Sequence, residues 1–234
     1  MGSRRSAKSR CRINESGGTV MRRILAIGAH LDDIELACGG TLAKAIKDGH
    51  AVKMVVLSRS GYTNYNGQVM RTDDAAMQEG RNAARVLGCN DLEILDFSNK
   101  DIPYSSEVVE ALEMRINDFK PDIIFTHWPF DTHQSHVGAS KSTISAARRY
   151  NTIYFYEPIS PSGRSYVGFR PQLYVDISDV IDQKIAALEE HVTERNKYGD
   201  YWTRGIEARA AFRGYEMGRL YGEAFEVLRE ELMI

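Results

Sequence analysis

Short apolar runs alternate along the chain with longer segments in which apolar residues recur every three or four positions. The short runs predict buried parallel strands at residues 21–29, 52–57, 92–97, 122–126 and 153–156, with an edge strand at 173–175. Helical spacing predicts helices at residues 34–47, 72–87, 105–119, 137–149, 178–194 and 204–232. This alternation predicts a Rossmann-like α/β fold, with a doubly wound, mostly parallel sheet and helices on both faces.

Polar and helix-breaking residues mark the ends of these elements. Gly88 and Pro121 end two of the helices, while Ser105 or Ser106 is a candidate N-cap, as is Ser178. Residues 59–70 are polar and contain glycine, which predicts a loop longer than most connections. Such a loop is a candidate for substrate contact or for a lid.

Composition limits the domain count. The 234 residues, 43% hydrophobic and 26% charged, suit one sizeable α/β domain, which we assign to residues 21–234. Residues 1–20 are basic and rich in small residues, and they predict a flexible N-terminal tail.

Charge and cysteine content exclude several classes of protein. The 30 basic and 32 acidic residues nearly cancel, so the sequence does not predict a nucleic-acid binder. No apolar run approaches the roughly 20 residues of a transmembrane helix. The odd number of widely spaced cysteines, Cys11, Cys38 and Cys89, fits a reducing compartment, and we expect a cytoplasmic protein. Cys38 is interpreted as a small packing residue.

Potential metal ligands follow the first and fourth predicted strands, which are neighbours in the commonest doubly wound order. The first strand is followed by His30, Asp32 and Asp33, and the fourth by His127, Asp131, His133 and His136. Ligands of such sheets bind at this carboxyl edge. Two imidazoles and one carboxylate with an open position are typical of hydrolytic zinc. A second carboxylate would serve as general base, and from the residues alone either aspartate could be the ligand.

The same segments resemble a known family. AIGAHLDDIELACGGT and the downstream DTHQSH resemble the PIG-L (LmbE-like) zinc N-deacetylases, which carry Ala-His-Pro-Asp-Asp after the first strand and a later His-x-x-His. RNAARVLG, KPDIIFTH and GYEMGRLYGEAFEVLRE extend the resemblance to roughly residues 21–232.

The resemblance implies a role for each site residue. His30, Asp33 and His136 would bind Zn²⁺, and Asp32 would be the general base. His133 would aid the tetrahedral intermediate or the leaving amine. The implied substrate is an N-acetylglucosamine-type sugar or glycoconjugate, whose acetamide is hydrolysed to acetate and a free amine.

Family members often form oligomers, and a homo-oligomer is expected here. The C-terminal segment could form its interface, because four glycines there permit close approach: Gly205, Gly214, Gly218 and Gly222.

The sequence departs from the family pattern at four positions. Leu31 stands at the usual proline, which reduces the rigidity of the turn, and Ala37 replaces a common glycine. Ser135 stands where an aspartate is frequent beside the last ligand, a role that Asp131 could take over. Ala76 occupies a common arginine position three residues before Glu79. Arg71 or Arg81 could take its place in substrate contact, although for both we expect a solvated helix face.

Two other functions are compatible with the residues. One is a Rossmann-like carbohydrate-binding module without catalysis, which only Ser135 favours. The other is a hydrolase of a different N-acyl amine. Of the remaining histidines, His127 is expected to make structural hydrogen bonds, with contact to a metal ligand or to the substrate as the alternative. His50 and His191 are expected to be surface or capping residues.

Overall fold

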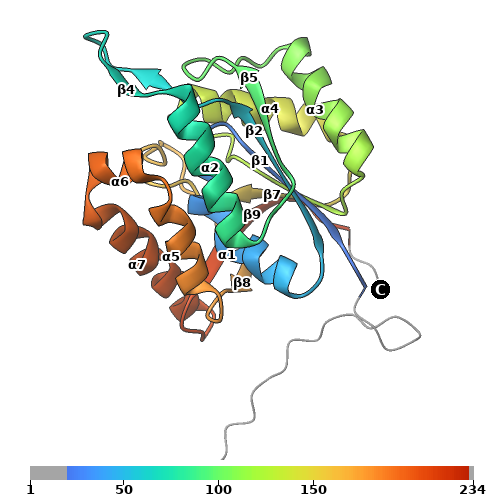
Figure 1. Ribbon diagram of the computed structural model, residues 1–234. Helices are drawn as coiled ribbons and strands as arrows, with labels where there is room; N and C mark the ends of the chain where they lie inside the picture. Colours follow the sequence, from blue (N-terminus) through green and yellow to red (C-terminus); the bar gives the residue numbers. More distant parts are fainter. Residues whose placement is uncertain (1–19, 232–234) are drawn as a thin grey trace, which may run out of the picture.

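A computed structural model describes residues 20–231, so the predicted tail lies outside the described residues except for Val20. The sheet order is β5-β2-β1-β6-β7-β9-β8 (Figure 1). Its strands are β1 (Arg23–Gly28), β2 (Ala51–Ser58), β5 (Leu92–Phe97), β6 (Ile123–Thr126), β7 (Ile153–Tyr156), β8 (Leu173–Asp176) and β9 (Gly222–Arg229). Five neighbouring strands are mutually parallel: β5, β2, β1, β6 and β7. Strand β9 runs antiparallel to both of its neighbours, β7 and β8. The predicted mostly parallel α/β sheet is confirmed.

Helices cover both faces of the sheet (Figure 1). One face carries α1 (Asp33–Lys47), α2 (Asp73–Leu87), α5 (Ile181–Glu189), α6 (Val192–Tyr198) and α7 (Asp200–Glu216). The other carries α3 (Ser106–Phe119) and α4 (Gln134–Ala146).

The alternating side chains of β1 connect the two layers. Ile24 and Ala26 pack in the cluster that includes α1, whereas Leu25 and Ile27 pack in the cluster that includes α3 and α4. A strand that is apolar on both faces explains the uninterrupted hydrophobic run in its sequence.

The central strand β1 pairs with β2 on one side and β6 on the other. Strands β1 and β6 are the first and fourth strands of the sequence prediction, and their expected adjacency is confirmed. The chain leaves β1 toward α1 on one face and reaches β6 from α3 on the other. Their carboxyl ends therefore form the switch point at which a ligand site is expected.

The C-terminal segment differs from the prediction. Residues 204–232 were predicted to be helical, but α7 ends at Glu216 and residues 222–229 form strand β9. Glu223 and Glu226 resemble solvated helix residues, yet both are buried in β9. Glu223 pairs with buried Lys184, and Glu226 accepts hydrogen bonds from Arg170 and Trp128. These partners come from distant parts of the chain, so the local pattern does not reveal them.

Three smaller differences concern helix and loop boundaries. Residues 178–194 contain two helices, α5 and α6, rather than one. Ser178 caps neither; its hydroxyl donates to Asp176. The predicted loop at 59–70 contains a hairpin of β3 (Tyr62–Thr63) and β4 (Val69–Arg71), which projects from the molecule in Figure 1. By contrast Ser105 caps α3 as predicted, accepting from the backbone N–H of Val108.

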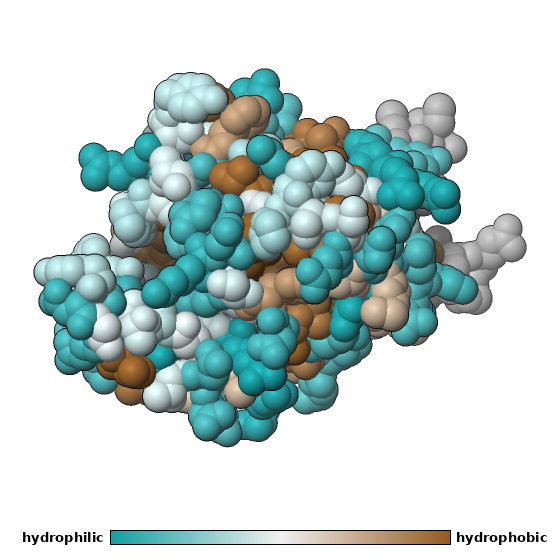
Figure 2. Space-filling view, turned by 90° about the horizontal axis from the view of Figure 1, so that it is seen from above, coloured by the Kyte–Doolittle hydropathy of each residue, from teal (hydrophilic) through white to brown (hydrophobic). Residues whose placement is uncertain are grey.

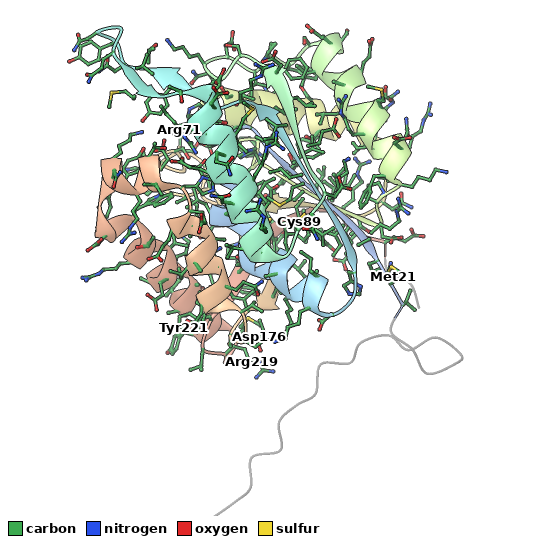
Figure 3. The ribbon with its side chains drawn as sticks, in the orientation of Figure 1. Met21, Arg71, Cys89, Asp176, Arg219 and Tyr221 are labelled. Atoms are coloured by element: carbon green, nitrogen blue, oxygen red, sulfur yellow. The ribbon has the colours of Figure 1, made fainter. Side chains whose placement is uncertain are left out.

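Two of the four C-terminal glycines serve packing within the chain. A Cβ atom at Gly214 would lie 2.6 Å from the backbone of Leu220, and one at Gly222 would meet Arg213 and Gly214 at 3.1 Å. Glycine is therefore needed where the chain turns back from α7 into β9. At this end of the molecule Arg219 and Asp176 form an ion pair at 3.0 Å (Figure 3).

Hydrophilic and hydrophobic residues are interspersed on the face seen in Figure 2. Among the described residues, no helix combines the length and the apolar character needed to cross a bilayer.

Candidate metal centre

A cavity of about 470 Å³ opens at the carboxyl ends of β1 and β6. It is lined by all five residues that the sequence assigns to the site: His30, Asp32, Asp33, His133 and His136. The aromatic residues Tyr62, Trp128, Tyr198 and Trp202 also line it. Aromatic side chains combined with a few polar groups are typical of a small-molecule site.

The three proposed metal ligands converge on one point of the cavity lining. One ligand atom from each of His30, Asp33 and His136 lies within 4.8 Å of the other two. The Nε2 atom of His136 is 3.2 Å from Nδ1 of His30 and 3.2 Å from Oδ1 of Asp33. Two imidazole nitrogens and a carboxylate oxygen form a donor set that suits Zn²⁺, so the residues fit a metal site.

Backbone geometry brings His30 and Asp33 together. The backbone N–H of His30 donates to Oδ2 of Asp33 at 2.7 Å, and the N–H of Asp33 approaches the carbonyl of His30 at 3.4 Å. Asp33 is the first residue of α1, and between the two residues Asp32 has φ 143°. L-residues rarely adopt such a φ, so this turn is strained.

Asp131 orients His136. Its Oδ2 atom lies 3.0 Å from Nδ1 of His136, which leaves Nε2 to face the other two ligands. Burial lowers the pKa of His136, but Asp33 and Asp131 outweigh burial and raise it to about 10. Ser135 is turned elsewhere and donates to the carbonyl of Asn99. Asp131 therefore occupies the orienting position that the family pattern suggested for residue 135.

His127 supports the site from beneath. It is 5% exposed, stacks on His136 with ring centroids 4.1 Å apart, and accepts at Nε2 from the backbone N–H of Ala29. Burial lowers its pKa, as does the neighbouring His136, which suits a neutral ring that accepts this hydrogen bond. Its Nε2 atom also lies 3.2 Å from Oδ2 of Asp33, so His127 contacts a proposed metal ligand in addition to making the expected structural hydrogen bond.

Asp32 lines the cavity beside the ligands. Burial raises the pKa of its carboxyl to about 7, with a further contribution from the like charge of Asp33. A carboxyl with such a pKa can exchange a proton near neutral pH, as a general base must.

His133 caps α4 with its side chain. Its Nδ1 atom accepts from the backbone N–H of Ser135 at 3.3 Å, so the ring proton of the neutral form resides on Nε2. Burial, His136 and His30 lower the pKa of His133 to about 4. The ring is therefore neutral at pH 7 and can donate from Nε2.

Arg71 and His191 are both buried, in contrast to the solvated and surface positions expected for them, and Arg71 lines the cavity. Arg71 lies at the base of the hairpin, beside the start of α2 (Figure 3), and is 4% exposed instead of solvated. Its guanidinium donates to Glu79 at 2.8 Å and to the carbonyl of Leu31 at 3.3 Å. His191 is fully buried and lies 3.3 Å from the same guanidinium. Their partners follow from tertiary structure, although the missing arginine at Ala76 did point to this region.

Cys38 and Arg81 lie as expected, one buried and the other exposed. Cys38 is fully buried, and burial raises the pKa of its thiol well above the usual value. Ala37 packs in the same core cluster. Arg81 is exposed on α2, as expected.

With this geometry established, known proteins provide a comparison. The sequence profile of the family described as GlcNAc-PI de-N-acetylase (PIG-L) matches residues 25–147. The diacetylchitobiose deacetylase of Thermococcus kodakarensis is 26% identical over 91% of this chain and 85% of its own. The uncharacterized deacetylase YaiS of Escherichia coli is 32% identical over 75% of this chain and 94% of its own.

One solved structure with the same fold is named a hydratase rather than a deacetylase. The hydratase GalB of Pseudomonas putida superposes with a TM-score of 0.75, at 21% identity, over 92% of this chain and 99% of its own.

Proposed function

Because this chain belongs to the GlcNAc-PI de-N-acetylase (PIG-L) family, we propose that it hydrolyses the acetamide of an N-acetylglucosamine-type sugar, consuming water and releasing acetate and a free amine. The observation that carries this proposal is the convergence of His30, Asp33 and His136 beside a carboxylate, Asp32, that is left free to move a proton. That combination is what metal-assisted hydrolysis requires.

The proposed cofactor is one Zn²⁺ held by His30, Asp33 and His136. When bound, zinc would polarise the acetamide carbonyl and lower the pKa of a water molecule to about 7. Three protein ligands are the number found in catalytic zinc sites, whereas structural sites usually have four. This count favours an enzyme over a binding module with a structural metal.

Asp32 is proposed as the general base. Its carboxyl lines the cavity and has a pKa of about 7, so it takes a proton from the attacking water near neutral pH. The same carboxyl can then return that proton to the departing amine, as proton balance requires.

His133 is proposed to stabilise the negative charge that develops on the carbonyl oxygen. Because Nδ1 accepts from the backbone of Ser135, the donor available to substrate is Nε2–H. Its pKa of about 4 makes His133 a poor proton source for the amine at pH 7, so oxyanion stabilisation is favoured over acid catalysis.

The cavity supports a sugar-sized substrate with a further substituent. Its volume of about 470 Å³ lies in the range of small-molecule sites, and aromatic walls suit the apolar face of a sugar ring. The names of two relatives identify them as deacetylases, one of them acting on diacetylchitobiose.

Metal analysis combined with an assay of amine release tests the proposal. Protein purified without chelator is expected to contain near-stoichiometric zinc and to release amine from N-acetylglucosamine or diacetylchitobiose, with activity lost on chelation and restored by zinc. Bound zinc without amine release from any N-acyl substrate would refute the deacetylase and favour hydration chemistry, as in the name of GalB. Absence of bound metal would refute the assignment of His30, Asp33 and His136 as metal ligands.

A further inference from the structure

The turn that carries Asp32 is held by hydrogen bonds from outside its own segment. His30 to Asp33 form a tight turn in which Leu31 is the second residue and Asp32, with φ 143°, the third. Turns with positive φ at the third position favour proline at the second, because proline presets the backbone angle there. Leu31 does not supply this rigidity and adds a buried N–H that needs an acceptor.

Ser60 provides that acceptor. The backbone N–H of Leu31 donates to Oγ of Ser60 at 2.8 Å, and Ser60 donates onward to the carbonyl of Ser58. Ser58 lies at the end of β2, and its own hydroxyl donates to the carbonyl of Ala29 at the end of β1. Ser58 and Ser60 are 0% and 3% exposed, so water does not compete for these bonds.

The backbone of Ser60 is itself unusual, with φ 66°. An L-residue pays a conformational cost at this φ that glycine does not. A serine thus stands at a position better suited to glycine, and its hydroxyl is the group that contacts the turn.

The opposite side of the turn is held as well. The guanidinium of Arg71 donates to the carbonyl of Leu31, the peptide that joins Leu31 to Asp32. The Leu31 side chain is 1% exposed and packs so closely on α2 that a Cβ atom at Gly80 would lie 2.4 Å from it. The backbone N–H, the backbone carbonyl and the side chain of Leu31 are therefore all held in place.

We propose that Ser60 is a positioning residue for the reaction: its hydroxyl holds the N–H of Leu31 and thereby fixes the backbone on which Asp32 stands, in place of a proline ring. The proposal rests on the proposed role of Asp32. Because a misplacement of about 1 Å can cost on the order of 100-fold in rate, loss of this bond affects kcat. The ligands His30 and Asp33 keep their own mutual hydrogen bond, so metal binding persists.

Ser60→Ala tests the hydroxyl directly. We expect kcat to fall roughly 10- to 100-fold, with KM and zinc content unchanged. The matched control is Ser142→Ala, which removes another buried hydroxyl that donates to a backbone carbonyl, that of Pro103 in a different part of the fold. The control should lower the melting temperature comparably and leave kcat unchanged. A wild-type kcat for Ser60→Ala would overturn the proposal.

A double-mutant cycle tests the exchange with proline. Leu31→Pro alone places the ring Cδ where the N–H now meets Oγ of Ser60, so it should impair both kcat and melting temperature. In the Ser60→Gly background the same substitution should raise kcat above that of Ser60→Gly alone. We call the hydrogen bond from the N–H of Leu31 to Oγ of Ser60 the Ser60–Leu31 clamp. Strictly additive changes in kcat would refute a role for this clamp. If the double variant does not fold, the comparison of Ser60→Ala with its control decides.

The melting temperatures separate failure of this inference from failure of the proposed function. If the wild type releases no amine while the melting temperatures of the cycle are non-additive, the deacetylase assignment fails and the Ser60–Leu31 clamp stands. If the wild type is active and both kcat and melting temperature are additive, the clamp fails and the deacetylase stands.

Discussion

Oδ2 of Asp131 lies 3.0 Å from Nδ1 of His136, on the side of the ring opposite the other proposed metal ligands. A carboxylate in this position holds the ring proton on Nδ1 and leaves Nε2 free to bind a cation. It also increases the basicity of the imidazole, consistent with the raised pKa of His136.

The first prediction concerns this carboxylate. Asp131→Asn should weaken zinc binding about 10- to 100-fold, the usual effect of losing a residue that orients a histidine ligand. Competition with a chelator of known affinity measures the change. Ser135→Ala is the matched control and should retain wild-type affinity, because Ser135 bonds the backbone of Asn99 instead. Equal losses in both variants would contradict the assignment.

The second prediction separates the two adjacent aspartates. Asp32→Asn should retain zinc and lower kcat by about 10²- to 10⁴-fold, the range typical of a lost general base. Elemental analysis and the amine-release assay on the same sample test both parts. An Asp32→Asn variant without zinc would mean that Asp32 and Asp33 have been assigned in the wrong order.

The third prediction concerns the stability gained on metal binding. A ligand at 100 times its Kd stabilises the folded state by about 2.7 kcal/mol, so zinc should raise the melting temperature of chelator-treated protein. His136→Ala should abolish this rise because one of three ligands is lost. A zinc-dependent rise that persists in His136→Ala would place the metal elsewhere.

The fourth prediction is a pH profile. Asp32 accepts a proton only when ionised, and its pKa of about 7 means that activity is lost as pH falls through that value. A bound divalent cation favours the ionised form and lowers this pKa, so kcat/KM should rise with a midpoint at or below pH 7. His133, with a pKa of about 4, stays neutral and adds no alkaline limb. A decline between pH 7 and 8 that disappears in His133→Asn would instead make His133 a general acid.

The fifth prediction concerns the buried arginine. Arg71→Leu should reduce the free energy of unfolding by about 3–5 kcal/mol, because it leaves the Glu79 carboxylate buried without its cation. Arg81→Leu on the exposed face of α2 provides the control and should change it by less than about 0.5 kcal/mol. Denaturant titration of both variants measures the difference. Similar values would show that the Arg71–Glu79 pair contributes little.

The sheet and the position of the site could be predicted because both depend on local patterns. Buried parallel strands appear as uninterrupted apolar runs, and β1 and β6 were identified in this way. Once those two strands are neighbours, the residues that follow them must meet at one edge. Residues 30–33 and 127–136 could therefore be expected to meet, whereas the choice of His30, Asp33 and His136 as metal ligands came from the family resemblance.

Buried charges account for most of what the sequence did not reveal. Arg71, Glu223 and Glu226 belong to residue types that usually face water. Arg71 was expected on a solvated helix face, and Glu223 and Glu226 fell within a segment predicted to be helical. Each is buried because a partner far along the chain neutralises it, such as Lys184 for Glu223. The hydrogen bond from Leu31 to Ser60 could not be predicted from the sequence for a similar reason, because 29 residues separate its two ends.

The position of β9 between β7 and β8 also restricts the order of events during translation. Strand β8 pairs with β9, which is made 46 residues later, counting from Asp176 to Gly222. While residues 222–229 are still inside the ribosome, β8 has no neighbour and Lys184 no Glu223. The parallel half of the sheet, with both segments that carry proposed metal ligands, can assemble on the nascent chain, but the edge of the sheet closes only after residues 222–229 emerge.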